Sequence, residues 1–336
     1  MKRIHDLSEL SWVVSGWAPD AWRLAPEACA EVPPVPAPVP GSVQQALKDA
    51  GLLPDWTMGL DARACEWVEN RHWIYEATLP EGVRLAGGRH RLHCEGLDWK
   101  GVVFLNDREV GRFEGAFTPH VFDLDEAMLE GENRLRLVFE CPPRSLGQAG
   151  FTSQMTTWKP RFNYTWDWTP RLVQIGVWDA VTLEVTDGDE IRDLRAWTSM
   201  EMRMETGNLN VRGHVGGTRA RRVRCVLTQR ENTIHEERFT AEEFQVGVSF
   251  RDIPVRLWWP NGTGAQPVYT LRVELLDEAE AVLDAVERRV GFKHVEWRAN
   301  EGAPDDAEPW LCVVNGRPLH LRGVSWLPIR PHFADV

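Results

Sequence analysis

The sequence has little tyrosine, no long apolar run and no surplus of positive charge. Its apolar stretches all fall short of the roughly 18 consecutive residues that cross a bilayer. The apolar patch Trp12-Val13-Val14 near the N-terminus is too short for the core of a signal peptide. These absences predict a protein with neither a membrane span nor a secretory leader.

Positive charge is outweighed in this chain. The 38 lysines and arginines face 50 aspartates and glutamates, which leaves a formal net charge of -12. The densest basic stretch alternates along an apparent strand, like the solvated face of a sheet, and consists of Arg219, Arg221, Arg222 and Arg224. A phosphate backbone would meet repulsion and find no basic stripe, so we expect no nucleic acid partner.

Motifs that hold metals or nucleotides are missing as well. The 6 cysteines form no C-x-x-C pair and the 10 histidines form no H-x-x-x-H pair, which argues against a metal site. No glycine-rich phosphate loop precedes a helix, so we expect no cofactor. The wide spacing of the cysteines favours buried, reduced thiols and a cytoplasmic location, with a long-range disulfide as the open alternative.

Tryptophan is the residue present in excess, with 17 copies against 3 tyrosines. The most informative run is YTWDWTPR at 164–171, in which Trp166 and Trp168 bracket Asp167. Indoles can cover the apolar face of a sugar, and a carboxylate can accept hydrogen bonds from its hydroxyls. At this point a second interpretation is equally open, a β-arch whose indoles fill a core while Asp167 caps a turn.

The first half of the chain shows the alternation typical of short strands. Residues 134–139 place Leu135, Leu137 and Phe139 on one face, as in a half-buried strand. Further strands are predicted at 72–79, 89–95, 102–105, 119–124 and 177–185. The proline-rich run at 32–40 should be extended over the surface. A short helix should follow, with Ser42 as its N-cap and Gly51 near its end.

The second half shows a new set of alternating segments after residue 186. Roughly seven short strands are predicted over about 100 residues, the spacing of an immunoglobulin-like sandwich. Near the end, residues 311–314, a turn at Asn315-Gly316 and residues 319–324 predict a hairpin that leads into a new strand. We expect the apolar residues after about Gly316 to be disordered or docked on a neighbour.

Short motifs recur along the chain in a recognisable order. They are VPGSV at 39–43, WVENRHWIY at 67–75, GLD at 96–98, VFLN at 103–106, WKP at 158–160, WDWTPR at 166–171, GVW at 176–178, LWWPNG at 257–262, VGFK at 290–293, NGRPL at 315–319 and LRGVSWLP at 321–328. This order resembles glycoside hydrolase family 2 and, within it, the β-mannosidases. The resemblance covers essentially the whole chain, and the WDW and WWPNG segments are its most specific parts.

The resemblance implies a mainly β fold. Residues 1–186 would form a jelly-roll-type, galactose-binding-like β-sandwich, and residues 187–296 an immunoglobulin-like β-sandwich. Residues 297–336 would form a linker and the first strands of a truncated (β/α)8 catalytic barrel, a TIM barrel.

The resemblance also implies where catalysis takes place. Retaining glycosidases use two carboxylates about 5–5.5 Å apart, which in this family are glutamates on later strands of the barrel. A whole barrel takes about 250 residues, so both glutamates are expected beyond Val336, and the chain alone should be inactive. No catalytic residue is therefore predicted within it. Other acidic groups should be solvated surface, namely Glu66/Glu69, Asp123/Asp125, Asp187/Asp189 and Asp305/Asp306/Glu308.

For substrate binding, the resemblance implies that Asp167 accepts hydrogen bonds from sugar hydroxyls while Trp166 or Trp168 forms a wall of the pocket. The ligand would be a terminal β-linked mannose or a related sugar, and the other partner would be the chain's own missing barrel. Lys159 and Arg171 would either reach the pocket or pair with acidic neighbours.

Two departures from the family pattern affect this picture. Thr165 and Thr169 stand where glycines are common, which predicts a different local backbone. Ile329 and Arg330 replace a small residue and an aspartate, which affects a neighbouring subsite.

Three alternatives remain open on the sequence. One is an exo-β-glucosaminidase or another family 2 specificity with the same architecture. Another is a stand-alone carbohydrate-binding module. The third is a two-domain interaction protein with no role in sugar binding.

Overall fold

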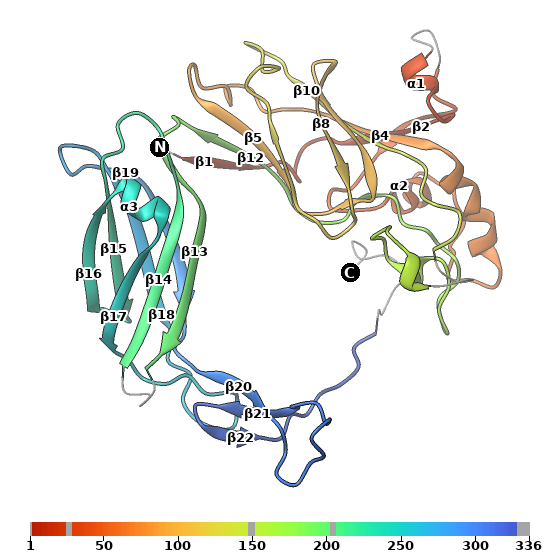
Figure 1. Ribbon diagram of the computed structural model, residues 1–336. Coiled ribbons are helices and arrows are strands. Elements are labelled where there is room, and N and C mark those ends of the chain that lie inside the picture. Colours follow the sequence, from red (N-terminus) through yellow and green to blue (C-terminus); the bar gives the residue numbers. More distant parts are fainter. Residues whose placement is uncertain (1, 25–28, 147–151, 202–205, 328–336) are drawn as a thin grey trace. The chain divides into compact units, whose positions relative to one another are not determined.

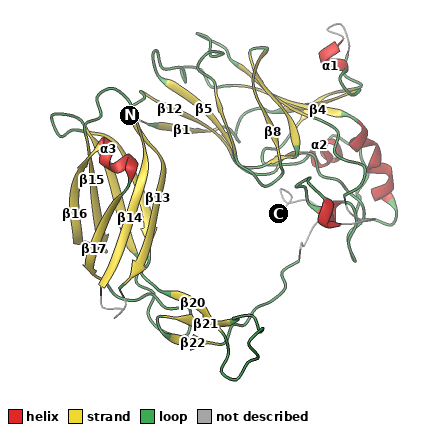
Figure 2. Cartoon of the chain, in the orientation of Figure 1, coloured by secondary structure: helices red, strands yellow, loops and turns green. Residues whose placement is uncertain are grey.

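The computed structural model describes residues 2–24, 29–146, 152–201 and 206–327, and it divides into two compact units. These are Arg3–Thr186 and Asp187–Ser325. Both are built mainly from antiparallel strands, with few and short helices (Figures 1 and 2). None of the helices in the described ranges is long and apolar enough to cross a membrane.

The first unit is a sandwich of two antiparallel sheets. A six-stranded sheet has the order β3-β2-β4-β10-β7-β8, and a four-stranded sheet the order β1-β12-β5-β9, with a short ladder between β6 and β11. The strands are β1 (Arg3–Asp6), β2 (Val13–Trp17), β3 (Val32–Pro36), β4 (His72–Thr78), β5 (Arg89–Cys94), β6 (Leu97–Asp98), β7 (Lys100–Leu105), β8 (Arg108–Glu114), β9 (His120–Asp123), β10 (Arg134–Phe139), β11 (Gly176–Val177) and β12 (Val181–Thr186). Both sheets contribute to one hydrophobic core, including Trp73 and Tyr75 from β4 and Leu92 and Leu183 from the smaller sheet.

Helical segments of the first unit lie in its connections. They are α1 (Ala21–Leu24), α2 (Val43–Asp49) and the 3-10 helices η1 (Asp61–Asn70), η2 (Thr152–Gln154) and η3 (Arg161–Asn163). The predicted helix is confirmed as α2, since the Ser42 hydroxyl caps it by accepting a hydrogen bond from the amide of Gln45 at 3.1 Å. Gly51 follows with a φ of 72°, a left-handed conformation that favours glycine.

Most of the strands predicted for this unit are confirmed, including the buried face of Leu135, Leu137 and Phe139. The proline-rich run is extended as expected, and part of it forms β3, an edge strand that pairs with β2. An edge tolerates proline because the outward side of an edge strand needs no amide donor.

The prediction of a single strand at 177–185 is wrong. The segment is split into β11, which pairs with β6, and β12, which pairs with β5. Between them the Trp178 indole packs over Gly96, where an added Cβ would come within 2.6 Å of the ring. Sequence alternation alone cannot reveal such a break, because it depends on how β5 and β6 are separated.

The second unit contains a seven-stranded immunoglobulin-like sandwich within its described residues. A three-stranded sheet has the order β13-β14-β17 and a four-stranded sheet the order β16-β15-β18-β19. The elements are β13 (Glu190–Met200), β14 (Thr206–Gly216), β15 (Arg222–Gln229), β16 (Asn232–Thr240), α3 (Ala241–Val246), β17 (Val248–Pro254), β18 (Tyr269–Leu276) and β19 (Val282–Val290). Its separate core includes Leu209, Phe250, Leu271 and Phe292.

A small third sheet ends the described chain and is formed by β20 (Val295–Arg298), β21 (Leu311–Val314) and β22 (Arg317–Leu319). The predicted hairpin turn at Asn315-Gly316 is confirmed, with φ values of 50° and 77°. Its second strand, however, is Arg317–Leu319 rather than 319–324, because the two-residue turn brings Arg317 directly opposite Val314. Leu319 is thus paired within its own sheet, contrary to the expectation of disorder or docking, whereas Leu321, Val324 and Trp326 lie outside any strand and are exposed.

The cysteines are free thiols, and four of the six are buried, namely Cys65, Cys94, Cys225 and Cys312. Cys29 is exposed and Cys141 half-buried, so the prediction of buried thiols holds only in part. Burial raises the pKa of Cys225 to about 12, which keeps this thiol protonated and unreactive at neutral pH.

Candidate functional site

The tryptophan-aspartate-tryptophan segment lies in a loop between η3 and β11 of the first unit. Asp167 is exposed, and the Trp166 and Trp168 side chains are 46% and 52% exposed. The indoles therefore do not fill a core, which overturns the β-arch interpretation of this segment. The loop instead presents a carboxylate between two half-exposed indole rings.

The base of this loop is fixed by a buried lysine. Lys159 donates hydrogen bonds through Nζ to Asp98 Oδ1 and to the backbone oxygen of Gln174, both at 2.7 Å. The Lys159 and Asp98 side chains are both fully buried. Burial lowers the pKa of Lys159, and the adjacent Asp98 carboxylate opposes that shift. Lys159 thus pairs with an acidic neighbour, one of the two roles considered for it, and its ammonium group is not exposed to a ligand.

Arg171 supports the other side of the loop. Its guanidinium group forms an ion pair with Glu69, donates to the backbone oxygen of Arg144 at 3.1 Å, and stacks over the Tyr164 ring at 4.9 Å. Burial raises the pKa of Glu69, and Arg171 partly offsets this shift. Arg171 also pairs with an acidic neighbour, and Glu69 is a loop support rather than the solvated residue that the sequence predicted.

Hydrogen bonds close the loop on itself and tie it to the segment that follows β10. The amide of Leu172 donates to the backbone oxygen of Asn163 at 2.8 Å, and the Tyr164 hydroxyl donates to the backbone oxygen of Pro143 at 2.7 Å. Thr169, one of the two threonines that flank the tryptophan-aspartate-tryptophan run, is buried and donates through Oγ1 to the backbone oxygen of Phe162 at 3.3 Å. Thr165 is exposed. Ile329 and Arg330 lie outside the described residues.

The segment that follows the loop is held by α2 and the residues before it. Gln44 donates through Nε2 to the backbone oxygen of Val173 at 2.6 Å. The amides of Val43 and Gly41 donate to Ile175 and Val177 at 2.8 and 2.6 Å. The exposed segment 165–168 is therefore carried by a backbone that is fixed on both sides.

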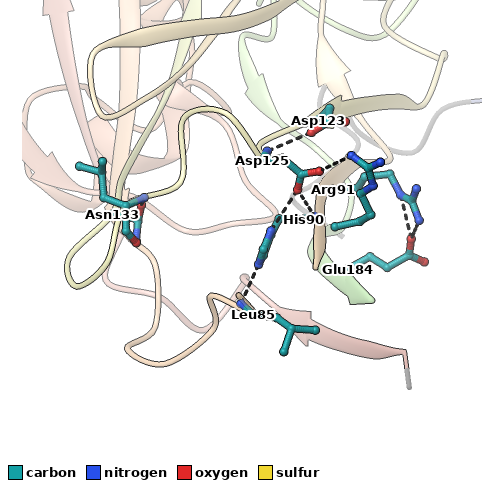
Figure 3. Close-up of polar contacts among 9 residues, drawn as sticks. Leu85, His90, Arg91, Asp123, Asp125, Asn133 and Glu184 are labelled. Carbon is teal, nitrogen blue, oxygen red and sulfur yellow. Dashed lines mark hydrogen bonds and ion pairs between the residues drawn. The ribbon is translucent and has the colours of Figure 1, made fainter. Parts of the chain in front are cut away.

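The Asp123/Asp125 pair is engaged in structural contacts. Asp125 accepts hydrogen bonds from the His90 amide at 2.6 Å, from His90 Nδ1 at 3.0 Å and from Arg89 at 3.0 Å (Figure 3). Burial acts to raise the pKa of Asp125, but these contacts hold it below its ordinary value. His90 Nε2 accepts from the Leu85 amide at 2.9 Å, so both ring nitrogens of His90 are also occupied. The Asp123/Asp125 pair is a structural network.

The remaining acidic groups form an ion-paired set and an exposed set. Asp187 and Asp189 share the Arg219 guanidinium group, and Asp189 is buried, so the prediction of solvated surface is wrong for Asp189. The others, apart from Glu69, are exposed and consist of Glu66, Asp305, Asp306 and Glu308. The Asp167 carboxylate is exposed and is flanked in sequence by two half-exposed indoles, and an ionised carboxylate in such a position can accept hydrogen bonds from hydroxyl groups.

Two residues that hold the loop were missed by sequence reasoning. Asp98 lies in the short strand β6, and Glu69 lies in η1, both remote in sequence from Asp167. Both belong to motifs noted in the sequence, but nothing in those motifs indicates that their carboxylates reach Lys159 and Arg171. Only the fold brings them together.

Comparisons with known proteins match both units. The family model described as "Glycosyl hydrolase 2 galactose-binding domain-like" matches residues 22–179. The model described as "Glycosyl hydrolases family 2" matches residues 190–293. The chain belongs to family 2 of the glycosyl hydrolases and is β-mannosidase-like over these domains.

Several curated proteins are similar to this chain. A β-mannosidase B from Emericella nidulans is 26% identical over 344 residues, covering 96% of this chain and 39% of the relative. A β-mannosidase B from Thermothelomyces thermophilus is 28% identical, covering 86% of this chain and 35% of the relative. The chain thus spans less than two fifths of the length of these two relatives.

Solved structures show the same fold. The crystal structure of a β-D-mannosidase from Dictyoglomus thermophilum superimposes with a TM-score of 0.79 at 25% identity, covering 99% of this chain and 41% of that one. A β-glucuronidase from Ruminococcus gnavus superimposes with a TM-score of 0.66 at 16% identity, covering 96% of this chain and 49% of that one. A similarity at this level of identity shows the fold alone.

Proposed function

We propose that this chain is the sugar-contacting, non-catalytic part of a β-mannosidase that hydrolyses terminal β-mannosides with retention. The observation that carries the proposal is the exposed Asp167 between Trp166 and Trp168 on a loop with a fixed backbone. The β-mannosidases among the similar proteins support the choice of sugar.

In this proposal the loop binds the terminal sugar by two complementary contacts. The Asp167 carboxylate accepts hydrogen bonds from two hydroxyls, because an ionised carboxylate has several acceptor sites and makes strong, charge-assisted bonds. The Trp166 and Trp168 rings cover apolar C–H faces of the sugar. The fixed backbone limits the entropy lost when the ligand is bound.

Catalysis would come from a barrel domain of the same protein. Within the described residues the acidic groups discussed above are exposed or engaged in structural pairs, and none forms the two-carboxylate arrangement of a retaining glycosidase. We propose that two glutamates outside this chain act as acid/base and nucleophile, and that the chain alone does not hydrolyse glycosides.

The decisive experiment is substitution of Asp167 in the complete protein. For Asp167→Ala we expect kcat/KM for an aryl β-mannoside to fall by about 10- to 100-fold, since a hydrogen bond to a charged group contributes about 1.5–3 kcal/mol. Asp167→Asn, which keeps the shape and loses the charge, should be intermediate. Glu66→Ala, an exposed carboxylate elsewhere in the first unit, serves as the control. Unchanged kcat/KM in Asp167→Ala would refute the proposed contact.

Two alternatives are separated by simple measurements. Comparing aryl β-mannoside with aryl β-glucosaminide hydrolysis by the complete protein distinguishes a β-mannosidase from an exo-β-glucosaminidase. A stand-alone binding module predicts that mannose shifts the tryptophan fluorescence of the isolated chain and that Asp167→Ala abolishes the shift. The exposed indoles make that module worth testing, and absence of any shift excludes it.

A cytoplasmic location is part of the proposal. It is supported by the six free thiols, which suit a reducing compartment. Fractionation of cells that produce the complete protein, followed by immunodetection, tests it directly.

A further inference from the structure

We infer that Asp98 and Lys159 form a positioning pair that fixes both ends of the Asp167 loop and thereby sets where its carboxylate meets the sugar. This inference rests on the proposed function, because it concerns how the sugar-binding loop is held. Neither residue is exposed to a ligand, so their role is to act through Asp167.

Lys159 lies just before η3, at the near end of the segment that carries Asp167, and its side chain reaches the far end of the loop. Its ammonium group donates to the Gln174 backbone oxygen at 2.7 Å, which joins two positions 15 residues apart in sequence. The same group donates to Asp98 Oδ1 at 2.7 Å. A single buried cation thus closes the base of the loop on which Asp167 is carried.

Asp98 fixes the end of the loop by its backbone as well. It lies in β6 directly opposite Gly176 of β11, the strand into which the loop leads. Its carboxylate holds the start of the loop through Lys159, and its main chain holds the end through the β6–β11 ladder. Asp98 therefore holds both ends of the loop, one through its side chain and the other through its backbone.

An ion pair at this position fixes the geometry of the two ends of the loop and adds little to the free energy of unfolding. Burying two charges costs desolvation energy that their attraction barely repays, and well-packed apolar pairs are often equally stable. Charge-assisted hydrogen bonds are, however, short and directional, so they define the distance between the two ends of a loop. Other contacts hold the middle of the loop, namely the Arg171–Glu69 ion pair, the hydrogen bond from Gln44 to Val173 and a small hydrophobic cluster of Leu146, Tyr164 and Val173 with Met155 beside it. The Asp98–Lys159 pair differs from these in joining the two ends.

The first test is amide hydrogen exchange on the present chain. In Asp98→Asn/Lys159→Met, which removes both charges together, exchange in the segment 163–173 should be about tenfold faster. The reporter is the Leu172 amide, which is bonded to Asn163 in the closed loop. Exchange in β4 and β10 should stay unchanged. Unchanged exchange at 163–173, or an equal increase throughout the unit, would overturn the inference.

The matched control removes another ion pair from the same unit. Arg91 donates to Glu184 Oε1 at 3.0 and 2.8 Å between β5 and β12 (Figure 3). Arg91→Met/Glu184→Gln should leave exchange in the segment 163–173 as in the unsubstituted chain. If this variant loosens the loop equally, the Asp98–Lys159 pair has no special role.

The second test is coupling to Asp167 in the complete protein, measured with an aryl β-mannoside. The pair variant should lower kcat/KM nearly as far as Asp167→Ala, and adding Asp167→Ala to it should have little further effect. If the effects of the two changes on kcat/KM multiply, Asp98 and Lys159 do not act by positioning Asp167. The same conclusion holds if Asp167→Ala lowers kcat/KM and the pair variant does not. If Asp167→Ala itself has no effect, the proposed function fails, whereas the exchange experiment still decides whether the pair holds the loop.

Discussion

His72 is buried at the start of β4, and its Nδ1 atom accepts hydrogen bonds from Trp22 Nε1 at 3.0 Å and from the Asp20 amide at 3.4 Å. Both contacts require the unprotonated nitrogen. Burial lowers the pKa of His72, and the nearby Asp20 and Glu140 charges offset this only in part. The first unit therefore folds around a neutral imidazole.

This histidine predicts a loss of stability in mild acid. The pKa of an unfolded histidine is about 6.5, so below that pH the unfolded chain binds protons that folded His72 resists, and the free energy of unfolding falls. His72→Asn keeps an acceptor in place of Nδ1 but cannot titrate. Urea denaturation at pH 7.5 and pH 5.5 should show a smaller loss for the variant.

His120 accounts for the pH dependence that remains in this variant. Burial lowers its pKa as well, so some slope should persist in His72→Asn. If wild type and His72→Asn lose equal stability between the two pH values, His72 does not stay neutral in the fold.

At the scale of elements, helix α2 links a local signal to the candidate site. Ser42 caps the helix, and Gln44 in its first turn holds the segment after the Asp167 loop through Val173. The cap was predictable, because a serine followed three residues later by glutamine is a local pattern. The contact with Val173 was not, since it joins residues 129 apart in sequence.

The cap predicts a measurable cost at this element. Ser42→Ala removes the acceptor of the Gln45 amide in a part-buried position, so the free energy of unfolding should fall by about 1 kcal/mol. The comparison is Thr240→Ala, which removes the cap of α3 in the second unit. Each variant should shift the urea transition of its own unit, and a Ser42→Ala chain of unchanged stability would contradict the assigned cap.

At the scale of the molecule, two hydrophobic cores are drawn from separate parts of the chain. One consists of residues between Leu7 and Val185 and the other of residues between Ile191 and Phe292. Leu137 in β10 and Leu271 in β18 are completely buried, each in its own core.

This division predicts separate effects of core substitutions. Leu137→Ala and Leu271→Ala should each cost about 2–5 kcal/mol through lost burial and a residual cavity. In calorimetry each should lower the melting temperature of one transition and leave the other in place. If both variants shift a single common transition, the two cores unfold as one cooperative body.

The fold class, most strand positions, the capped helix and the family resemblance were predictable from the sequence. These features depend on period-2 alternation, local turn chemistry and motif order, which are readable without contacts. The sequence also located the segment around Asp167, and the family assignment that it suggested is confirmed.

Which side chains of that segment are exposed, and which carboxylates hold it, depends on the packing of the folded chain. Trp166 and Trp168 are half-exposed although indoles are usually buried, and Glu69 is largely buried although it was expected to be solvated. Asp98 reaches Lys159 across 61 positions and Glu69 reaches Arg171 across 102. Such long-range pairings arise when sheets and loops pack together, and no local pattern in the sequence encodes them.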